Sequence, residues 1–97
     1  MDEIEFSWDA RKAKQNVKKH SVPFEKASTV FFDEKAIEFF DPDHSEGEDR
    51  FLMLGLGWRL RILVVCYCLR KSGSEIKIIS ARKATKKEMR LYAGSQK

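Results

Sequence analysis

Cysteine, proline and glycine are scarce in this chain, and long apolar runs are missing. Of the 97 residues, two are Cys, two are Pro and five are Gly. The longest apolar run, residues 62–69, is far shorter than the roughly 20 residues that span a membrane. The first residues carry acids and no hydrophobic segment, so we expect no signal peptide. These absences predict a protein that works in the cytoplasm and has no attachment to a membrane.

The low cysteine content also limits disulfide and metal chemistry. Cys66 and Cys68 are separated by one residue within a strand-like run, so both would point to one face of one strand. Such a pair closes a disulfide poorly, and two thiols alone are too few to hold a metal ion. We expect two buried free thiols in a reducing compartment. The length supports one domain, residues 1–97, without a separate cofactor domain. Neither a cofactor nor a metal is expected.

Charge is sorted along the chain. The net charge is +4. Residues 9–20 hold five cations and one acid, residues 33–50 hold eight acids and two cations, and residues 58–97 hold eleven cations and two acids. Two basic segments around an acidic one predict a cationic surface for nucleic acid or another acidic partner. The alternative is that Lys and Arg only decorate positions that face solvent.

The spacing of apolar residues predicts an α+β fold. Residues 3–8 alternate as a strand does, and Asp9 is a good N-cap for a helix over residues 10–19. The apolar stripe of that helix would be Ala10, Ala13 and Val17. The remaining expected elements are a helix over 24–32, strands over 36–40, 50–55, 59–69 and 75–82, and a helix over 86–92. The order β-α-α-β-β-β-β-α predicts an antiparallel sheet with helices packed on it.

The last predicted strand runs into a cluster of cations and hydroxyls. Ser80, Arg82 and Thr85 precede a helix that begins with two lysines. Backbone N–H groups, an arginine fork and hydroxyls at such a junction are suited to holding a phosphate. A strand end with Thr85 as a helix cap explains the same residues without a ligand. On the junction alone the two interpretations are equally supported.

The first predicted helix carries a second polar cluster. Lys12, Asn16 and Lys19 are spaced to share one face, away from the apolar stripe, and His20 follows at the helix end. Histidine changes charge near neutral pH, so His20 could act as a general acid or base. Taken by itself, the cluster is better explained as a solvated basic face with a C-terminal cap. Its combination with polar residues elsewhere favours a functional site; these are Arg61, Arg70, Arg82 and Thr85.

Three motifs spread along the chain fit one family pattern. The first is Trp8-Asp9-x-x-Lys12-x-x-x-Asn16-x-x-Lys19-His20. The second is Arg50-Phe51-x-x-x-Gly55, followed by Arg61 and Val64-Val65-x-Tyr67-x-x-Arg70. The third is Ile78-Ile79-Ser80-Ala81-Arg82-x-Ala84-Thr85-x-x-Glu88-x-x-x-Tyr92. In this order and at this spacing, over nearly the whole chain, the motifs resemble the BrnT family of toxins.

The resemblance implies a fold, an activity and partners. BrnT proteins have a RelE-like fold and are the toxins of bacterial type II toxin–antitoxin systems. They act as metal-independent ribonucleases that stop translation. Their antitoxin, BrnA, binds the toxin and uses a ribbon-helix-helix domain to bind operator DNA. The resemblance therefore implies an RNA substrate, a BrnA-type antitoxin in a two-plus-two heterotetramer, and contact with DNA only through that antitoxin.

A few positions depart from the family pattern. Ser21 stands where Gly usually follows the His, which makes a left-handed helix end less easy. Leu60 stands where Gly often precedes the Arg, and Arg59 makes the assignment of Arg61 ambiguous. Cys68 replaces a usual Thr, so a hydroxyl is lost from the sheet. These changes affect details of the site rather than the fold.

Cleavage of RNA without a metal ion sets three chemical tasks. The 2′-hydroxyl must lose a proton, the charge on the phosphorane must be stabilised, and the 5′-oxygen must gain a proton. We expect the guanidinium groups of Arg61, Arg70 and Arg82 to stabilise the charge, and His20 to transfer the proton. Contacts to phosphate or base are expected from six more residues, which are Lys12, Asn16, Lys19, Ser80, Thr85 and Tyr92.

Two other functions fit the same residues. One is a non-catalytic nucleic-acid-binding module that leaves the RNA backbone intact. The other is a partner-binding module in which the acidic segment 33–50 and the cationic face complement another chain. The residues alone leave both open, because the basic face offers no second catalytic His or clearly placed carboxylate. The family resemblance is what favours the ribonuclease.

Overall fold

Residues 4–44 and 47–95 are described by a computed structural model, in which five strands form one sheet. The strands are β1 (Glu5–Ser7), β2 (Ile37–Phe40), β3 (Arg50–Leu56), β4 (Ile62–Arg70) and β5 (Glu75–Lys83). The helices are α1 (Ala10–His20), α2 (Phe24–Ala27) and α3 (Lys86–Gly94), and the 3₁₀ segment η1 (Ser28–Phe32) follows α2 directly. The predicted α+β class and the predicted order of elements are confirmed.

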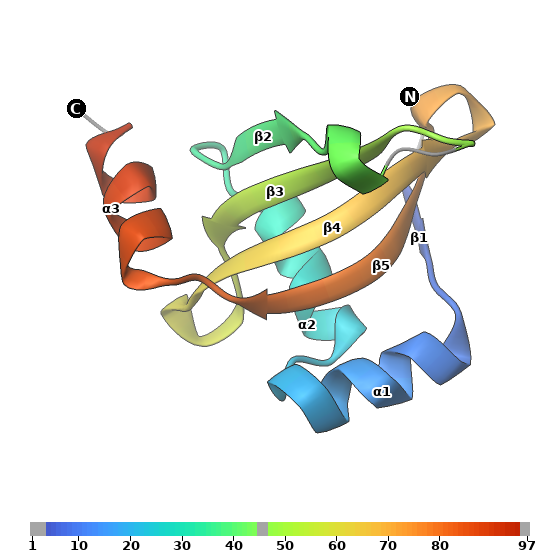
Figure 1. The fold of residues 1–97 in the computed structure, drawn as a ribbon, viewed down its shortest axis with the longest axis horizontal. Helices are drawn as coiled ribbons and strands as arrows, with labels where there is room; N and C mark the ends of the chain where they lie inside the picture. Colours follow the sequence, from blue (N-terminus) through green and yellow to red (C-terminus); the bar gives the residue numbers. More distant parts are fainter. Residues whose placement is uncertain (1–3, 45–46, 96–97) are drawn as a thin grey trace.

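The sheet is mixed rather than wholly antiparallel. Its strand order is β1-β5-β4-β3-β2, with antiparallel pairing from β2 to β5 and a parallel pair between β1 and β5 (Figure 1). The expectation of a purely antiparallel sheet is thus corrected at one edge. After β1 the chain passes through α1 and α2, and a parallel pair needs a crossover of this kind. Alternating apolar residues mark β1 as a strand but carry no information on its direction.

Side chains from the two faces of the sheet form two cores. On one face, α2 and η1 pack against β4 and β5 around Phe24 and Val65, which are fully buried. On the other face, Tyr92 of α3 packs with Leu54 and Val64. Val64 and Val65 belong to different cores because successive side chains of a strand point to opposite faces. α3 stands at one end of the strands (Figure 1), so it covers only part of the second face.

The second predicted helix, residues 24–32, is only partly α-helical. α2 ends at Ala27, and the chain continues as the 3₁₀ segment η1. The hydroxyls of Ser28 and Thr29 donate to backbone carbonyls three residues earlier. Such bonds compete with the α-helical hydrogen-bond pattern. The predicted core positions of the segment are nevertheless buried or half-buried; these are Phe24, Ala27, Val30 and Phe31.

β4 begins at Ile62, three residues later than the sequence predicts. Residues 58–61 form the turn from β3 instead. Within it, Arg59 and Leu60 have positive φ angles of 60° and 57°, which are incompatible with extended strand backbone. The ends of the other elements outside residues 24–32 agree with the prediction to within two residues.

Candidate functional site

The two ends of α1 are capped by neighbouring side chain and backbone groups. The backbone N–H groups of Lys12 and Arg11 donate to the Asp9 carboxylate at 3.2 and 2.8 Å, and they lower the pKa of that carboxyl. The predicted N-cap is confirmed. At the other end, Ser21 takes a left-handed backbone with φ 61° and donates its N–H to the Val17 carbonyl. The chain therefore makes the left-handed helix end even without the Gly that is favoured there.

The buried face of α1 differs from the predicted apolar stripe. Val17 is 44% exposed, whereas Asn16 is only 6% exposed. The Asn16 amide donates to the Ala81 carbonyl at 2.8 Å and accepts the Ala81 N–H at 3.1 Å, as a neighbouring strand would. It also donates to the Val22 carbonyl at 2.8 Å. β1 pairs with β5 only as far as Lys77, so Asn16 satisfies backbone groups of β5 beyond the end of that pairing. These bonds give Asn16 a structural role, and its contact with RNA stays a prediction.

A groove of 220 Å³ lies between α1 and β5, and we call it the α1–β5 groove. Its lining includes half of the predicted site residues, which are Lys12, Asn16, Lys19, His20 and Ser80. Gln15 and Ile79 complete the lining. The lining of one hollow therefore includes two lysines, a histidine and a serine, and it includes no acidic residue. Such a donor set is suited to a phosphate.

A β-bulge in β5 lies at this groove. Cys66 pairs with Ser80 and Tyr67 with Ile78, so Ile79 is an extra residue without a partner on β4. Bulges turn neighbouring side chains and are frequent beside functional sites. Ser80 follows the bulge, is exposed, and pairs across the sheet with Cys66. It therefore lies both in the groove and at the edge of the sheet face that carries α3.

At the predicted phosphate-binding junction after β5, the carboxylate of Glu88 already bonds to Arg82 and Thr85. The Arg82 guanidinium donates to both Glu88 oxygens, at 2.7 and 3.0 Å. Glu88 also accepts the Thr85 N–H at 2.8 Å, while the Thr85 hydroxyl accepts the Glu88 N–H at 3.2 Å. The Arg82 bond lowers the pKa of Glu88 to about 2 and raises that of Arg82. Of the two interpretations of the junction, the helix cap therefore accounts for Thr85.

Tyr92 has a different environment from the one expected for a residue that stacks on RNA bases. It is only 8% exposed and packs in the second core. Its hydroxyl donates to Asp33 at 2.6 Å, and this bond raises the pKa of Tyr92 to about 12. A buried ring offers no face to a base, so this environment favours a core role for Tyr92, and its contact with RNA stays a prediction.

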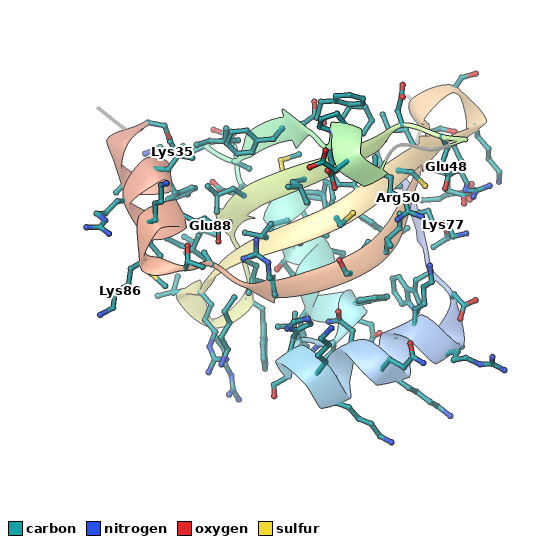
Figure 2. The ribbon with its side chains drawn as sticks, viewed as in Figure 1. Lys35, Glu48, Arg50, Lys77, Lys86 and Glu88 are labelled. Atoms are coloured by element: carbon teal, nitrogen blue, oxygen red, sulfur yellow. The ribbon has the colours of Figure 1, made fainter. Side chains whose placement is uncertain are left out.

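The three predicted arginines do not form one cluster. Arg70 pairs with Glu48 at 3.3 Å and Arg82 with Glu88 at 2.7 Å. Figure 2 shows Glu48 and Glu88 toward opposite ends of the sheet. The strand register agrees, since Arg82 lies opposite Val64, six residues before Arg70 on β4, a separation of roughly 20 Å. Arg61 directly precedes β4, at the end away from Arg70. One phosphate cannot contact all three.

Sequence reasoning missed two cations on the sheet face. Arg50 lies opposite Cys68 on β4, and Lys77 lies opposite the same residue on β5. Both side chains are labelled in Figure 2, at the end of the sheet away from α3. Side chains paired across strands share a face, so the two cations flank one small residue. The alternation of side chains along β3 and β5 assigns each cation to a face of its strand, but their position beside Cys68 depends on strand register, which the sequence does not specify.

The two cysteines are free thiols, as predicted, but only Cys68 is buried, whereas Cys66 is half-buried. Burial raises the pKa of Cys66, although Arg50 acts in the opposite direction. Burial likewise raises the pKa of Cys68, and the nearby charge of Glu48 adds to the effect. Both thiols therefore stay protonated near neutral pH, and a protonated thiol is a weak nucleophile.

Comparison with known proteins places this arrangement in a family. Residues 8–88 match the model of the BrnT family, described as the ribonuclease toxin of a type II toxin–antitoxin system. The chain belongs to the BrnT family. The crystal structure of the Brucella abortus ribonuclease toxin BrnT is similar, with a TM-score of 0.65 and 21% identity over 86% of this chain and 99% of that one. At this identity the likeness concerns the fold. No curated protein sequence matches the chain.

Membership of the BrnT family makes the chain a ribonuclease toxin that acts with an antitoxin. Residues 4–44 and 47–95 contain no group of three or more His, Cys, Asp or Glu side chains placed to hold a metal ion. No helix in the same residues is long and apolar enough to cross a membrane. The assignment of roles to residues then depends on the geometry of the α1–β5 groove and the sheet face beside it.

Proposed function

We propose that this BrnT-family toxin cleaves RNA in the α1–β5 groove without a metal ion. The observation that carries the proposal is the convergence of His20, Lys12, Lys19 and Ser80 on one hollow from two distant parts of the chain. These residues can bind a phosphate and move a proton, as the reaction requires.

The reaction is an internal transfer within the RNA. The 2′-oxygen loses its proton and forms a bond to phosphorus, while the bond from phosphorus to the 5′-oxygen breaks and that oxygen takes up a proton. The products are a 2′,3′-cyclic phosphate and a 5′-hydroxyl. His20 accepts the proton from the 2′-oxygen and delivers a proton to the 5′-oxygen, because histidine changes charge near neutral pH. Lys12 and Lys19 bind the phosphate oxygens, and Ser80 donates a hydrogen bond to them.

Arg82 lies two residues after Ser80 on β5, a rise of roughly 7 Å along a strand. Its guanidinium has five N–H donors, of which two bond to Glu88 and one bonds to the Lys83 carbonyl at 3.4 Å. The remaining donors stabilise the charge on the phosphorane. Arg61 and Arg70 lie at opposite ends of β4, so they bind other phosphates of the same RNA strand. Thr85 contributes indirectly, by capping the helix that carries Glu88.

The antitoxin of this toxin is a BrnA-type protein with a ribbon-helix-helix domain. Domains of that type dimerise, which favours a two-plus-two heterotetramer and leaves contact with operator DNA to the antitoxin. The eleven cations after residue 58 favour an acidic partner through long-range attraction. The toxin acts in the cytoplasm, where translated RNA is found, and the antitoxin neutralises it by excluding RNA from the groove.

The competing function is an RNA-binding module that leaves the backbone intact. Purified toxin, freed of its antitoxin, separates the two when it is incubated with messenger RNA and the RNA is sized on a denaturing gel. We expect fragments with the wild type and at least 100-fold slower cleavage with His20→Gln, because general acid–base catalysis contributes factors of about 10² to 10⁴. Intact RNA that is bound by the wild type would favour the binding module.

A further inference from the structure

The turn between β3 and β4 presents an apolar side chain to solvent. Leu60 is 82% exposed, the largest exposed fraction among the large hydrophobic residues of the described chain. Trp58 in the same turn and Met89 of α3 are also exposed, at 38% and 41%. Exposed apolar residues that gather in one place mark interaction sites more often than single ones do.

The backbone of this turn is unusual for the residues that form it. Arg59 and Leu60 both have left-handed backbone, with φ angles of 60° and 57°. The Arg61 N–H donates to the Trp58 carbonyl at 3.4 Å, so the two residues occupy the central positions of a tight turn. Gly, Asn and Asp are favoured at such positions, whereas Leu is strained there. Strained backbone is retained where a function requires the geometry.

The turn is held firmly at its base. The Gly57 N–H donates to the Arg61 carbonyl at 2.8 Å, and the Trp58 N–H donates to the Thr29 hydroxyl at 2.8 Å. A Cβ atom at Gly57 would come within 2.8 Å of the same hydroxyl oxygen. The turn therefore packs tightly on η1 and presents Leu60 in a fixed position, which reduces the entropy lost when a partner binds.

Two hollows flank the turn. One has a volume of 320 Å³ and is lined by Leu60, Arg61, Ile62, Lys83 and Met89. The other has a volume of 290 Å³ and includes Thr29, Asp33 and Trp58, with the 73% exposed Phe32 at its side. We call the exposed apolar residues around both hollows the hairpin surface; they are Phe32, Trp58, Leu60 and Met89.

Cations border the hairpin surface. The Lys26 ammonium and the Arg59 guanidinium lie 4.7 and 4.3 Å from the centre of the Trp58 ring. Arg61 and Lys83 line the larger hollow. The acid in the smaller hollow, Asp33, already accepts the Tyr92 hydroxyl and the Leu56 N–H. A binding partner must therefore combine apolar side chains with carboxylates.

We propose that the hairpin surface is a docking site for the antitoxin, which inserts an apolar side chain beside Leu60 and places Asp or Glu residues against Arg59 and Lys83. The inference rests on the antitoxin partnership that the BrnT family implies and adds the place and chemistry of contact. Exposed Leu and Met side chains suit a protein segment, because they offer a nucleotide neither hydrogen bonds nor an aromatic face. The Trp58 ring, which could stack on a base, is already contacted by two cations.

Leu60→Gly tests the proposal, because Gly relieves the left-handed backbone while it removes the apolar side chain. Binding of the antitoxin encoded beside this toxin is measured by calorimetry, together with the melting temperature and the rate of RNA cleavage. We expect an unchanged or higher melting temperature, unchanged cleavage, and an affinity for the antitoxin at least tenfold lower. Ser72→Gly, at φ 58° in the turn before β5, and Leu69→Ser, at a 44% exposed leucine on β4, serve as matched controls and should bind as the wild type does.

Antitoxin affinity within twofold of the wild type for Leu60→Gly would overturn the proposal. The same holds if Leu60→Gly weakens binding of a single-stranded RNA and leaves antitoxin binding unchanged, because the surface would then contact RNA. Arg59→Glu provides an independent measurement if Leu60→Gly folds poorly, and it should lower antitoxin affinity most at low salt. The two proposals can fail separately. If Leu60→Gly binds the antitoxin more weakly but the wild-type toxin does not cleave RNA, the docking site is supported and the proposed ribonuclease mechanism is contradicted.

Discussion

Arg82 and Glu88 form a two-pronged ion pair that joins the end of β5 to the first turn of α3. The Nη1–Oε1 and Nη2–Oε2 distances are 2.7 and 3.0 Å. Because Glu88 also accepts the Thr85 N–H at 2.8 Å, one carboxylate fixes both the helix start and the direction of the guanidinium. A planar fork held in this way presents its remaining N–H groups to a phosphate in a defined orientation.

Removing the charge of Glu88 should change the pH dependence of stability. The pKa of Glu88 is about 2 in the folded protein against an ordinary value of 4.5. The stability that this carboxylate contributes is therefore present above pH 4.5 and is lost as the pH falls through about 2. Glu88→Gln can keep the capping hydrogen bonds, so we expect a loss of about 1 kcal/mol at pH 7, since Arg82 is partly exposed. The loss should shrink toward pH 2. Urea unfolding at several pH values measures the difference in the free energy of unfolding between the two proteins. A difference that stays the same from pH 7 to pH 2 would contradict the lowered pKa of Glu88.

Arg82 should matter more for cleavage than Arg70. Arg82→Ala removes a donor next to the groove, and loss of one donor to a transition-state charge lowers rates by about 10² to 10³. Arg82→Lys keeps the charge without the fork, so an intermediate loss is expected. Arg70→Ala, at the other end of β4, should lower the rate by less than tenfold. Single-turnover cleavage of one RNA compares the three, with circular dichroism to confirm that each is folded. Equal loss in Arg82→Ala and Arg70→Ala would contradict a site at the groove.

Asn16 and Lys12 line the same groove, but we expect their substitution by Ala to have different effects. Asn16→Ala leaves the Ala81 N–H and the Ala81 and Val22 carbonyls without their partner. Unsatisfied buried groups of this kind reduce stability by about 2–4 kcal/mol in total. Lys12 is exposed, so Lys12→Ala should leave stability unchanged and weaken RNA binding instead. Denaturant unfolding and RNA titration of both variants separate the effects. A wild-type unfolding curve for Asn16→Ala would refute its structural role.

The fold was predictable where local patterns decide it. Asp9 and Thr85 are capping residues recognisable from their sequence neighbours, and both cap helices in the structure. Two features depend on distant contacts instead. The parallel pairing of β1 with β5 joins residues about 70 positions apart, and the burial of Asn16 follows from the open edge of β5 at Ala81. The spacing of apolar residues along the chain predicts neither the β1–β5 pairing nor the burial of Asn16.

The candidate site was predictable in composition but not in arrangement. His20, Lys12, Lys19 and Ser80 were proposed from residue type and do share one groove. The burial of Tyr92 was not predictable, because a tyrosine on a closing helix can face either solvent or the core, and here its hydroxyl bonds to Asp33. The separation of Arg70 from Arg82 follows from strand register, which the sequence does not specify. Roles in catalysis stay predictions.

Antitoxin and RNA should bind the toxin competitively. If the antitoxin closes the α1–β5 groove, each ligand weakens the other by the same factor. RNA binding should also weaken as salt rises, because phosphate contacts release counterions. Both effects are measured by titrating a fluorescent RNA with the cleavage-deficient His20→Gln toxin. The titration is done with and without antitoxin and at two salt concentrations. Formation of a stable ternary complex would show that neutralisation works in another way.

The most direct measurement of the central claim is an analysis of the RNA ends made by antitoxin-free toxin in excess chelator. The account predicts fragments with 2′,3′-cyclic phosphate or 3′-phosphate ends and 5′-hydroxyl ends, at a rate that chelator leaves unchanged. His20→Gln, purified in the same way, should give intact RNA, which excludes a contaminating nuclease. Cleavage that stops in chelator, returns with added divalent ion and leaves 3′-hydroxyl ends would contradict the account.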